Sequence, residues 1–130
     1  MQSDKVAAAV VYNPELEKFL LVKRSKERER FPDHWEFPSG FIEENETAED
    51  AAIRELKEET GLAGEVIRKG ESFPIQIPKV DVYPILVKTF EENVELSREH
   101  SEYRWVEKNE LEILKTVPKL KQDLEKVGIK

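Results

Sequence analysis

GFIEENETAEDAAIRELKEETGL, residues 40–62, is the segment that decides how this chain folds. Its second half predicts an α-helix that Thr47 opens and that runs to about Thr60. Thr47 and Asp50 stand at the spacing of a capping box, which satisfies free N–H groups at a helix start. Gly61 suits the left-handed conformation that commonly ends a helix. An apolar stripe along this helix predicts that it packs against another layer of the protein.

Three glutamates share the side of this helix that carries the apolar stripe. At about 100° per residue, Glu59 falls between two alanines, and Glu55 and Glu58 lie beside it. Carboxylates at this spacing repel one another, oppose the helix dipole and lose hydration against apolar neighbours. A divalent cation would relieve all three problems, and oxygen donors without cysteine or nearby histidine favour Mg²⁺ or Mn²⁺ over zinc. The alternative is a solvated acidic surface, which is the commoner origin of a charge run.

The rest of the chain predicts mainly strands and one further helix. The expected strands cover residues 5–12, 19–24, 35–37, 66–67, 73–77, 80–89 and 103–106. Pro84 suggests an edge position or a bulge, and the charged run 25–30 is expected to be a solvated loop. Residues 116–118, Thr-Val-Pro, predict the start of a terminal helix that runs to about Val127. The expected class is α/β (α+β), with helices covering a sheet.

The chain has 130 residues, 28 acidic and 21 basic, with a formal net charge of −7. This length suits a single domain that spans residues 1–130. The absence of cysteine excludes a disulfide scaffold, a thiol nucleophile and a thiolate zinc site. The acidic balance argues against binding DNA or an acidic membrane, but it permits a small anionic substrate if a cation binds too. No apolar run approaches the length of a signal sequence or a membrane span, so a cytoplasmic protein is expected.

Gly40, Glu46 and the run RELKEETGL at residues 54–62 resemble the signature of the Nudix hydrolase family, G-x5-E-x7-R-E-U-x-E-E-x-G-U, with U aliphatic. Every specified position matches. Residues 35–38, WEFP, are similar to the lead-in of MutT-like members. Residues 96–105, LSREHSEYRW, are similar to a segment of MutT-like proteins and diadenosine tetraphosphate hydrolases. The resemblance implies a Nudix-type α/β/α sandwich, a mixed β-sheet with the motif helix and a C-terminal helix packed on it.

Two positions depart from the family pattern. Ser39 stands where a glycine is common, and Asn45 stands where a glycine commonly precedes Glu46. In the family, the main-chain carbonyl at the first of these positions can help to bind metal, so Ser39 is a candidate metal ligand. Asparagine is the best non-glycine residue for a left-handed conformation. The loop is therefore expected to keep its shape with a shifted geometry.

The resemblance implies catalytic and metal-binding roles for the charged residues of the motif. Glu58 and Glu59 are the expected direct metal ligands, and Glu55 either binds metal or helps to activate water. Arg54 is expected to hold a motif carboxylate in place, with Glu46 as the first candidate. A plain surface ion pair is the alternative for this arginine.

Other candidates lie outside the motif. The resemblance implies that Glu99 completes the metal site or acts as general base. His100, beside it, is interpreted as an ordinary loop histidine rather than a phosphate donor. Lys23 and Arg24 close a strand and are candidates to bind substrate phosphates, although a charged strand end facing solvent is an equal alternative. Phe37 is a candidate substrate contact, although a core position suits an aromatic residue here better.

The family hydrolyses a nucleoside diphosphate linked to another group X. The resemblance therefore implies a hydrolase of acid anhydrides that uses Mg²⁺ or Mn²⁺. The expected substrate is a small nucleotide, first a nucleoside triphosphate cleaved to the monophosphate and pyrophosphate, as in MutT-like members. An asymmetric diadenosine polyphosphate hydrolase is the alternative, and a non-catalytic nucleotide-binding module is a third. No DNA or membrane partner is expected, and the family suggests a homodimer.

Overall fold

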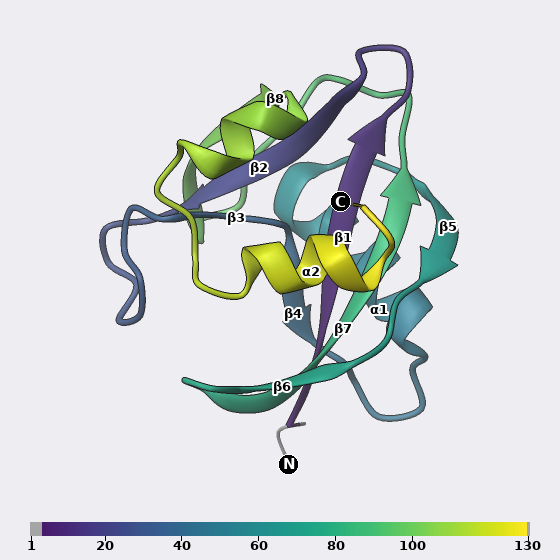
Figure 1. Ribbon diagram of the computed structural model, residues 1–130, viewed down its shortest axis with the longest axis vertical. Coiled ribbons are helices and arrows are strands. Elements are labelled where there is room, and N and C mark those ends of the chain that lie inside the picture. The colour runs from purple at the N-terminus through teal and green to yellow at the C-terminus, as the bar shows by residue number, and fades with distance from the viewer. Residues whose placement is uncertain (1–3, 130) are drawn as a thin grey trace.

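A computed structural model describes residues 4–129 and shows a mixed β-sheet between helices (Figure 1). The strands are β1 Lys5–Asn13, β2 Lys18–Arg24, β3 Trp35–Glu36, β4 Ser39–Phe41, β5 Glu65–Lys69, β6 Phe73–Gln76, β7 Lys79–Lys88 and β8 His100–Val106. The helices are α1 Ala48–Thr60 and α2 Leu120–Lys126, and a 3₁₀ helix spans Lys108–Glu112.

The sheet is centred on β1 and β7, which run parallel, with Lys5 opposite Asp81 and Tyr12 opposite Lys88. Outward from this pair, β1 continues to β2 and β4, β7 continues to β5 and β6, and β2 continues to β3 and β8. Parallel strands that are covered on both faces carry continuous apolar runs. The run AAAVV at residues 7–11 of β1 has this character, and all five side chains are fully buried.

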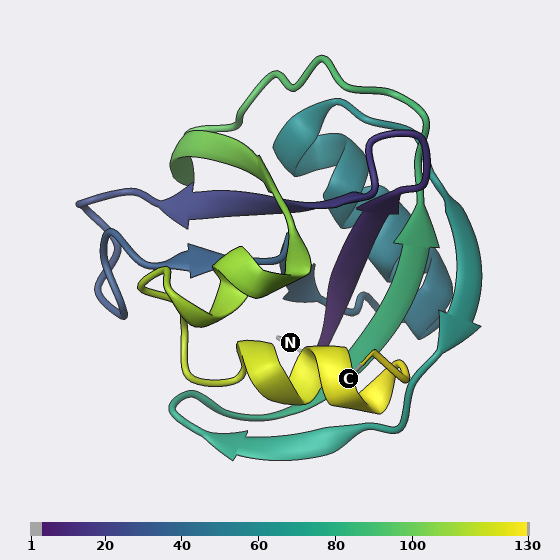
Figure 2. The same cartoon turned by 45° about the horizontal axis from the view of Figure 1, so that its top comes forward.

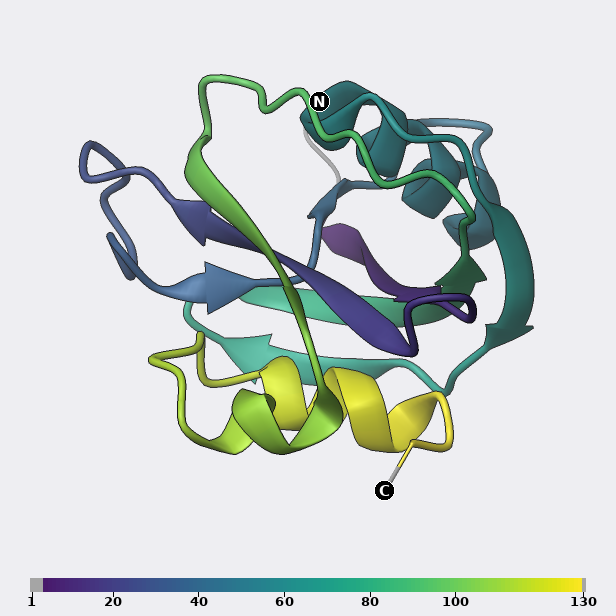
Figure 3. The ribbon, with the colours of Figure 1, turned by 90° about the horizontal axis from the view of Figure 1, so that it is seen from above.

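The two faces of the sheet are covered by different helices (Figures 2 and 3). On one face, Ala9 and Val11 of β1 pack with Leu56 of α1. On the other face, Val10 packs with Leu120 of α2 and with other apolar residues near the C-terminus. Successive residues of β1 thus face opposite helices, as the period of a strand requires. The layers form the α/β/α sandwich that the resemblance implied.

The motif helix α1 has the ends that the sequence predicted. Thr47 is its N-cap, and the Thr47 hydroxyl accepts a hydrogen bond from Asp50 N at 3.0 Å. Gly61 is its C-cap, with φ of 78° and an N–H that donates to Lys57 O. A positive φ of this kind suits glycine, since a side chain there would strain the backbone. Local capping therefore determines where the helix that carries the three motif glutamates begins and ends.

Other elements differ from the predictions in their bounds. The terminal helix begins at Leu120, two residues after Pro118, because a turn at residues 117–120 precedes it. Pro84 lies in the central strand β7 and not at an edge. Its carbonyl accepts from Gly70 N, at the point where the partner of β7 changes from β6 to β5. The lack of an N–H group on Pro84 is tolerated there, because neither β5 nor β6 pairs with this residue. Within residues 4–129, no helix is long and apolar enough to cross a lipid bilayer.

Candidate active site

α1 presents its three motif glutamates to different surroundings. Glu59 lies on the sheet side with 2% of its surface exposed. The side chain of Glu55 is 13% exposed and that of Glu58 is 55% exposed. The helical period explains the burial of Glu59, since it follows the fully buried Leu56 by three residues and Ala52 by seven. The apolar stripe therefore carries one carboxylate into the interior.

Both carboxylate oxygens of Glu59 are shielded from solvent and lack a hydrogen-bond partner. Burial raises the pKa of Glu59 well above its usual value, and the neighbouring Glu55 carboxyl group raises it further. A buried carboxylate without partners is costly, so these oxygens favour a bound cation. Carboxylate oxygens are the ligands that Mg²⁺ and Mn²⁺ prefer, so Glu59 fits the role of a metal ligand.

Gly40 of β4 leaves the space that the Glu55 side chain occupies. β4 pairs with β1 through Gly40 opposite Ala7 and lies against α1. A Cβ atom at position 40 would collide with the Glu55 carboxyl group. Here the motif glycine is needed for close approach and not for an unusual backbone angle.

Asn45, one of the two departures from the family pattern, has the backbone conformation that the sequence predicted. Asn45 has a φ of 66°, so an asparagine does adopt the left-handed conformation there. Ser39 pairs with Ala8 in β4 and lines a cavity beside the motif. The role of the Ser39 carbonyl as a metal ligand stays a prediction.

Arg54 binds carboxylates from both ends of the motif. Its Nε lies 2.8 Å from Glu46 Oε2, and its Nη1 lies 2.8 Å from Glu55 Oε1 and 3.1 Å from Glu58 Oε2. The hydrogen bond from Arg54 is the main cause that lowers the pKa of Glu46. Within residues 4–129, no three acidic or histidine side chains already form a metal cage. Two of the candidate metal ligands, Glu55 and Glu58, are thus already hydrogen-bonded to the guanidinium group of Arg54.

Glu99 lies in the segment that precedes β8, and this segment is fastened to the end of α1. Ser97 N donates to the main-chain oxygen of Glu59 at 3.1 Å. Glu99 is exposed and forms an ion pair with Arg28 at 3.5 Å. Its negative charge adds to burial and to Glu55 in raising the pKa of Glu59. The structure thus brings Glu99 within electrostatic range of the α1 cluster, and its catalytic role stays a prediction.

A cavity of about 410 Å³ adjoins this cluster, since Ser39 and Gly40 line it. Cavities of this size hold one small organic ligand. Much of its wall is apolar: Val6, Phe31, Phe41, Ile75, Ile77 and Val117. Its cationic lining consists of Arg24, Arg28, Arg30 and Lys119. An apolar wall with several cations suits a ligand that has an uncharged part and an anionic part.

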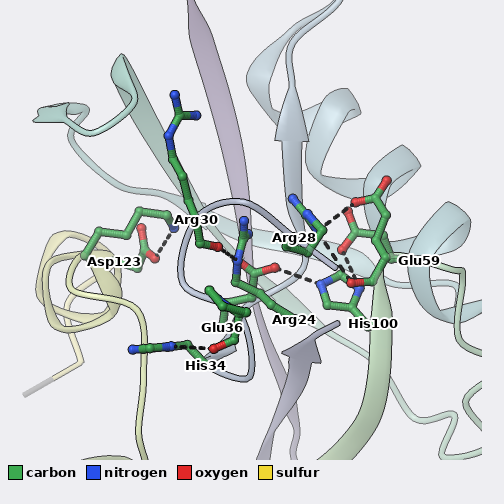
Figure 4. Close-up of polar contacts among 11 residues, drawn as sticks. Arg24, Arg28, Arg30, His34, Glu36, Glu59, His100 and Asp123 are labelled. Atoms are coloured by element: carbon green, nitrogen blue, oxygen red, sulfur yellow. Dashed lines mark hydrogen bonds and ion pairs between the residues drawn. The ribbon is translucent and has the colours of Figure 1, made fainter. Parts of the chain in front are cut away.

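The sequence identified only one of these four cations. Arg24 was predicted, and its Nη1 lies 3.0 Å from Glu36 Oε1 while its Nε donates to Arg30 O (Figure 4). Arg28 and Arg30 belong to the charged run that was interpreted as a solvated loop. Nothing in their local pattern distinguishes them from surface arginines, because only the folding of this loop over the cavity gives them a role. Lys119, just before α2, was missed for the same reason.

Lys23, predicted with Arg24 to bind phosphates, does not line the cavity. Its Nζ lies 3.3 Å from Glu102 Oε2 and 5.7 Å from the centre of the Trp35 ring. Neighbouring residues of a strand point to opposite faces, which fits the observation that Arg24 lines the cavity and Lys23 does not. The structure therefore removes Lys23 from the candidate site.

The structure decides between the alternatives for two further residues. Phe37 is fully buried in the cluster beneath α2, so the core position that the sequence favoured is confirmed and the candidate substrate contact is not. His100 is not an ordinary loop histidine, since it begins β8 and is 5% exposed. Its Nε2 lies 2.7 Å from Glu36 Oε2, and its Nδ1 lies 3.7 Å from Glu59 Oε1. No local sequence signal announces this burial, because Glu36 and His100 are 64 residues apart.

Comparison with known proteins leads to the same family as the signature. A NUDIX domain model matches residues 2–127, so the chain belongs to the Nudix hydrolase family. An asymmetrical bis(5′-nucleosyl)-tetraphosphatase of Sus scrofa is 35% identical over 81 residues, which cover 56% of this chain and 55% of that protein. The chain thus spans about half the length of the curated relatives that it matches first.

Solved structures match over nearly the whole chain. An Ap4A hydrolase of C. elegans, in a binary complex, has a TM-score of 0.76 and 28% identity, with 93% of each chain covered. The MutT protein from Methanosarcina mazei Go1 has a TM-score of 0.69 and 26% identity, with 92% of this chain and 87% of that chain covered. Both likenesses cover more than nine tenths of this chain, so they extend well beyond the motif.

Gly40→Ala tests whether the close approach of β4 to α1 holds the Glu55 side chain in place. The new methyl group would push the Glu55 carboxyl group aside, so we expect Mn²⁺ affinity to fall by about tenfold. The backbone at position 40 has no positive φ, so unfolding by urea should show little loss of stability. Gly61→Ala is the matched control, since it strains the backbone at φ of 78° but meets no heavy atom closer than 3.8 Å. The control should lose stability with Mn²⁺ affinity unchanged, and the reverse pattern would contradict this account of Gly40.

Proposed function

We propose that this protein hydrolyses a phosphoanhydride bond in a nucleoside diphosphate linked to another group, with a divalent cation bound at α1. The observation that carries this proposal is the buried carboxylate of Glu59, whose two oxygens lack partners. A cavity with a cationic lining adjoins this part of the protein through β4. A pure binding module has no need for a costly buried carboxylate beside such a cavity, which supports hydrolysis over binding alone.

The metal-binding part of the site is formed by Glu58 and Glu59, with Glu55, Glu99 and the Ser39 carbonyl as further ligands. A divalent cation bound there supplies Lewis acidity, which lowers the pKa of bound water and neutralises phosphoryl oxygens. Glu55 or Glu99 accepts the proton of the attacking water. Arg54 holds Glu55 and Glu46 in place, so it positions the motif. Magnesium as the metal is part of this proposal.

The cavity forms the substrate-binding part of the site. Its cations face the phosphates and its apolar wall receives the nucleoside, which suits a ligand of mixed character. This local positive charge matters because the chain as a whole carries a net charge of −7. Water attacks one phosphorus atom, the bridging P–O bond breaks, and the displaced phosphate group leaves with its bridging oxygen.

Two substrate classes fit this arrangement. The first is a dinucleoside tetraphosphate cleaved asymmetrically, and the likeness to the tetraphosphatase of Sus scrofa and the Ap4A hydrolase of C. elegans supports it. The second is a nucleoside triphosphate cleaved to the monophosphate and pyrophosphate, and the likeness to the MutT protein of Methanosarcina mazei Go1 supports it. The comparisons with the tetraphosphatases move the first class ahead of the triphosphates that the sequence favoured. Cytoplasmic location and a homodimer stay predictions.

A substrate panel tests the proposed function. Nucleoside triphosphates, dinucleoside tetraphosphates and ADP-sugars are incubated with the protein, with and without Mg²⁺, and the products are separated by ion-exchange chromatography. We expect Mg²⁺-dependent cleavage, fastest for a dinucleoside tetraphosphate and giving unequal products. Faster release of pyrophosphate from a triphosphate would favour the second class. Tight nucleotide binding without turnover of any substrate would refute the proposal and leave a binding module.

Glu59→Gln tests the buried carboxylate directly. The amide keeps the size of the side chain but lacks the charge that binds a cation, so kcat should fall by about a thousandfold or more. Stability should not fall, because the variant no longer buries a charge without partners. Glu49→Gln, in the first turn of the same helix, is the control and should keep normal turnover. Near-normal Mg²⁺-dependent turnover of folded Glu59→Gln would show that the metal lies elsewhere.

Arg30→Ala tests the cavity as the phosphate-binding surface. We expect KM for the nucleotide to rise by about tenfold, since one charged contact to phosphate is lost, with kcat little changed. Steady-state kinetics at saturating Mg²⁺ measures both constants. Lys26→Ala, an exposed cation of the same loop that does not line the cavity, should leave KM unchanged. Equal changes in both variants would indicate a diffuse charge effect and not a defined contact.

A further inference from the structure

His100 is a buried side chain that stands between two carboxylates from different elements (Figure 4). Its side chain is 1% exposed, and its Nε2 lies 2.7 Å from Glu36 Oε2 of β3. Its Nδ1 lies 3.7 Å from Glu59 Oε1 of α1 and has no hydrogen-bond partner. Within residues 4–129, His100 is the one basic side chain with a nitrogen within 4 Å of a Glu59 oxygen.

The far side of His100 is held by a chain of polar contacts. Glu36 is 4% exposed, and its Oε1 lies 3.0 Å from Arg24 Nη1. Burial raises the pKa of Glu36, but the hydrogen bond from His100 and the charge of Arg24 outweigh it and lower that pKa. An ionised carboxylate can only accept, so the Nε2 atom of His100 carries the hydrogen and donates. Arg24 is itself held, because its Nε donates to Arg30 O at 2.8 Å.

This chain of contacts gives the imidazole ring one orientation, with Nδ1 aimed at Glu59. Ligands of metal ions are commonly oriented by such outer partners, which restrict the rotamers of the ligating side chain. His100 contacts Glu59 and not the other two motif glutamates. Glu55 and Glu58 accept hydrogen bonds from Arg54, while Glu59 has no hydrogen-bond partner. Filling this space with apolar side chains would avoid the cost of burying these charged groups, so their presence needs a reason.

We infer that His100 is a positioning residue for Glu59, with Glu36 and Arg24 holding its ring. It keeps the Glu59 carboxylate in the rotamer that binds the divalent cation. This inference rests on the proposed function for the identity of Glu59 as a metal ligand. Arg24 and Glu36 also line the cavity, so the same contacts join the substrate-binding part of the site to the metal-binding part.

A double-mutant cycle on Mn²⁺ affinity tests the inference. Electron paramagnetic resonance measures free Mn²⁺ with the wild-type protein, His100→Gln, Glu59→Gln and the double variant. Glutamine keeps a donor near the position of Nε2 but leaves nothing opposite Glu59. We expect His100→Gln to weaken Mn²⁺ binding by about tenfold to a hundredfold. In the Glu59→Gln background the same change should have no further effect, because His100 acts through Glu59.

His34→Gln is the matched control, since the chain has two histidines and His34 is partly exposed with its Nδ1 near Pro32 O. It should keep normal Mn²⁺ affinity. Equal losses from His100→Gln in both backgrounds, or normal affinity of folded His100→Gln, would overturn the inference. If turnover of all nucleotides is absent while the cycle shows coupling, the proposed function fails and the inference stands. If nucleotides are turned over and the cycle shows no coupling, the proposed function stands and the inference fails.

A measurement on the wild-type protein covers the case in which His100→Gln does not fold. With ¹⁵N-labelled histidine, two imidazole rings are observed by NMR, those of His34 and His100. Addition of Mg²⁺ should shift the ring nitrogens of His100 and leave those of His34 in place. An unshifted His100 ring at saturating Mg²⁺ would overturn the inference. With turnover, the Mg²⁺ concentration at half-maximal rate should rise in His100→Gln, while KM for the nucleotide stays the same.

Discussion

Glu59 carries a carboxylate into the interface between α1 and the sheet, and the polar groups around it are arranged with respect to that charge. Its oxygens are shielded from solvent and lack a hydrogen-bond partner. In a protein interior such a group is stable only if it is protonated or faces a cation. The glycine of β4, the arginine of the motif and the histidine of β8 each limit where the neighbouring side chains can lie. The buried side of α1 thus depends on groups from β4 and β8, which are distant from it in sequence.

The chain is acidic overall and still has a cavity with features of a phosphate-binding site, because its charges are unevenly distributed. The chain has a net charge of −7, yet its cavity is lined by four basic side chains. A group of acidic side chains lies on and beside α1, where Arg54 neutralises part of their repulsion. Positive and negative regions therefore lie side by side, which suits a site that holds a cation and a polyanion together.

Most of α1 could be predicted from the sequence because its causes are local. Thr47 and Gly61 cap the helix through contacts within four residues, and the burial of Glu59 follows from the helical period. The resemblance implied the pairing of Arg54 with Glu46, which the geometry shows. Bounds of the terminal helix and the placement of Pro84 were less predictable, since both depend on which strands and turns become neighbours.

By itself the sequence determined the motif helix, its caps, the class of fold and the acidic cluster, because each follows from short-range periodicity and from the spacing of one motif. Only the tertiary structure decided which charged residues meet. It brought Arg28 and Arg30 over the cavity, turned Lys23 away from it, and placed His100 against Glu36. It also assigned Phe37 to the core. Such contacts join residues that are far apart in the chain, so their physical cause is the packing of the sheet and not any local pattern.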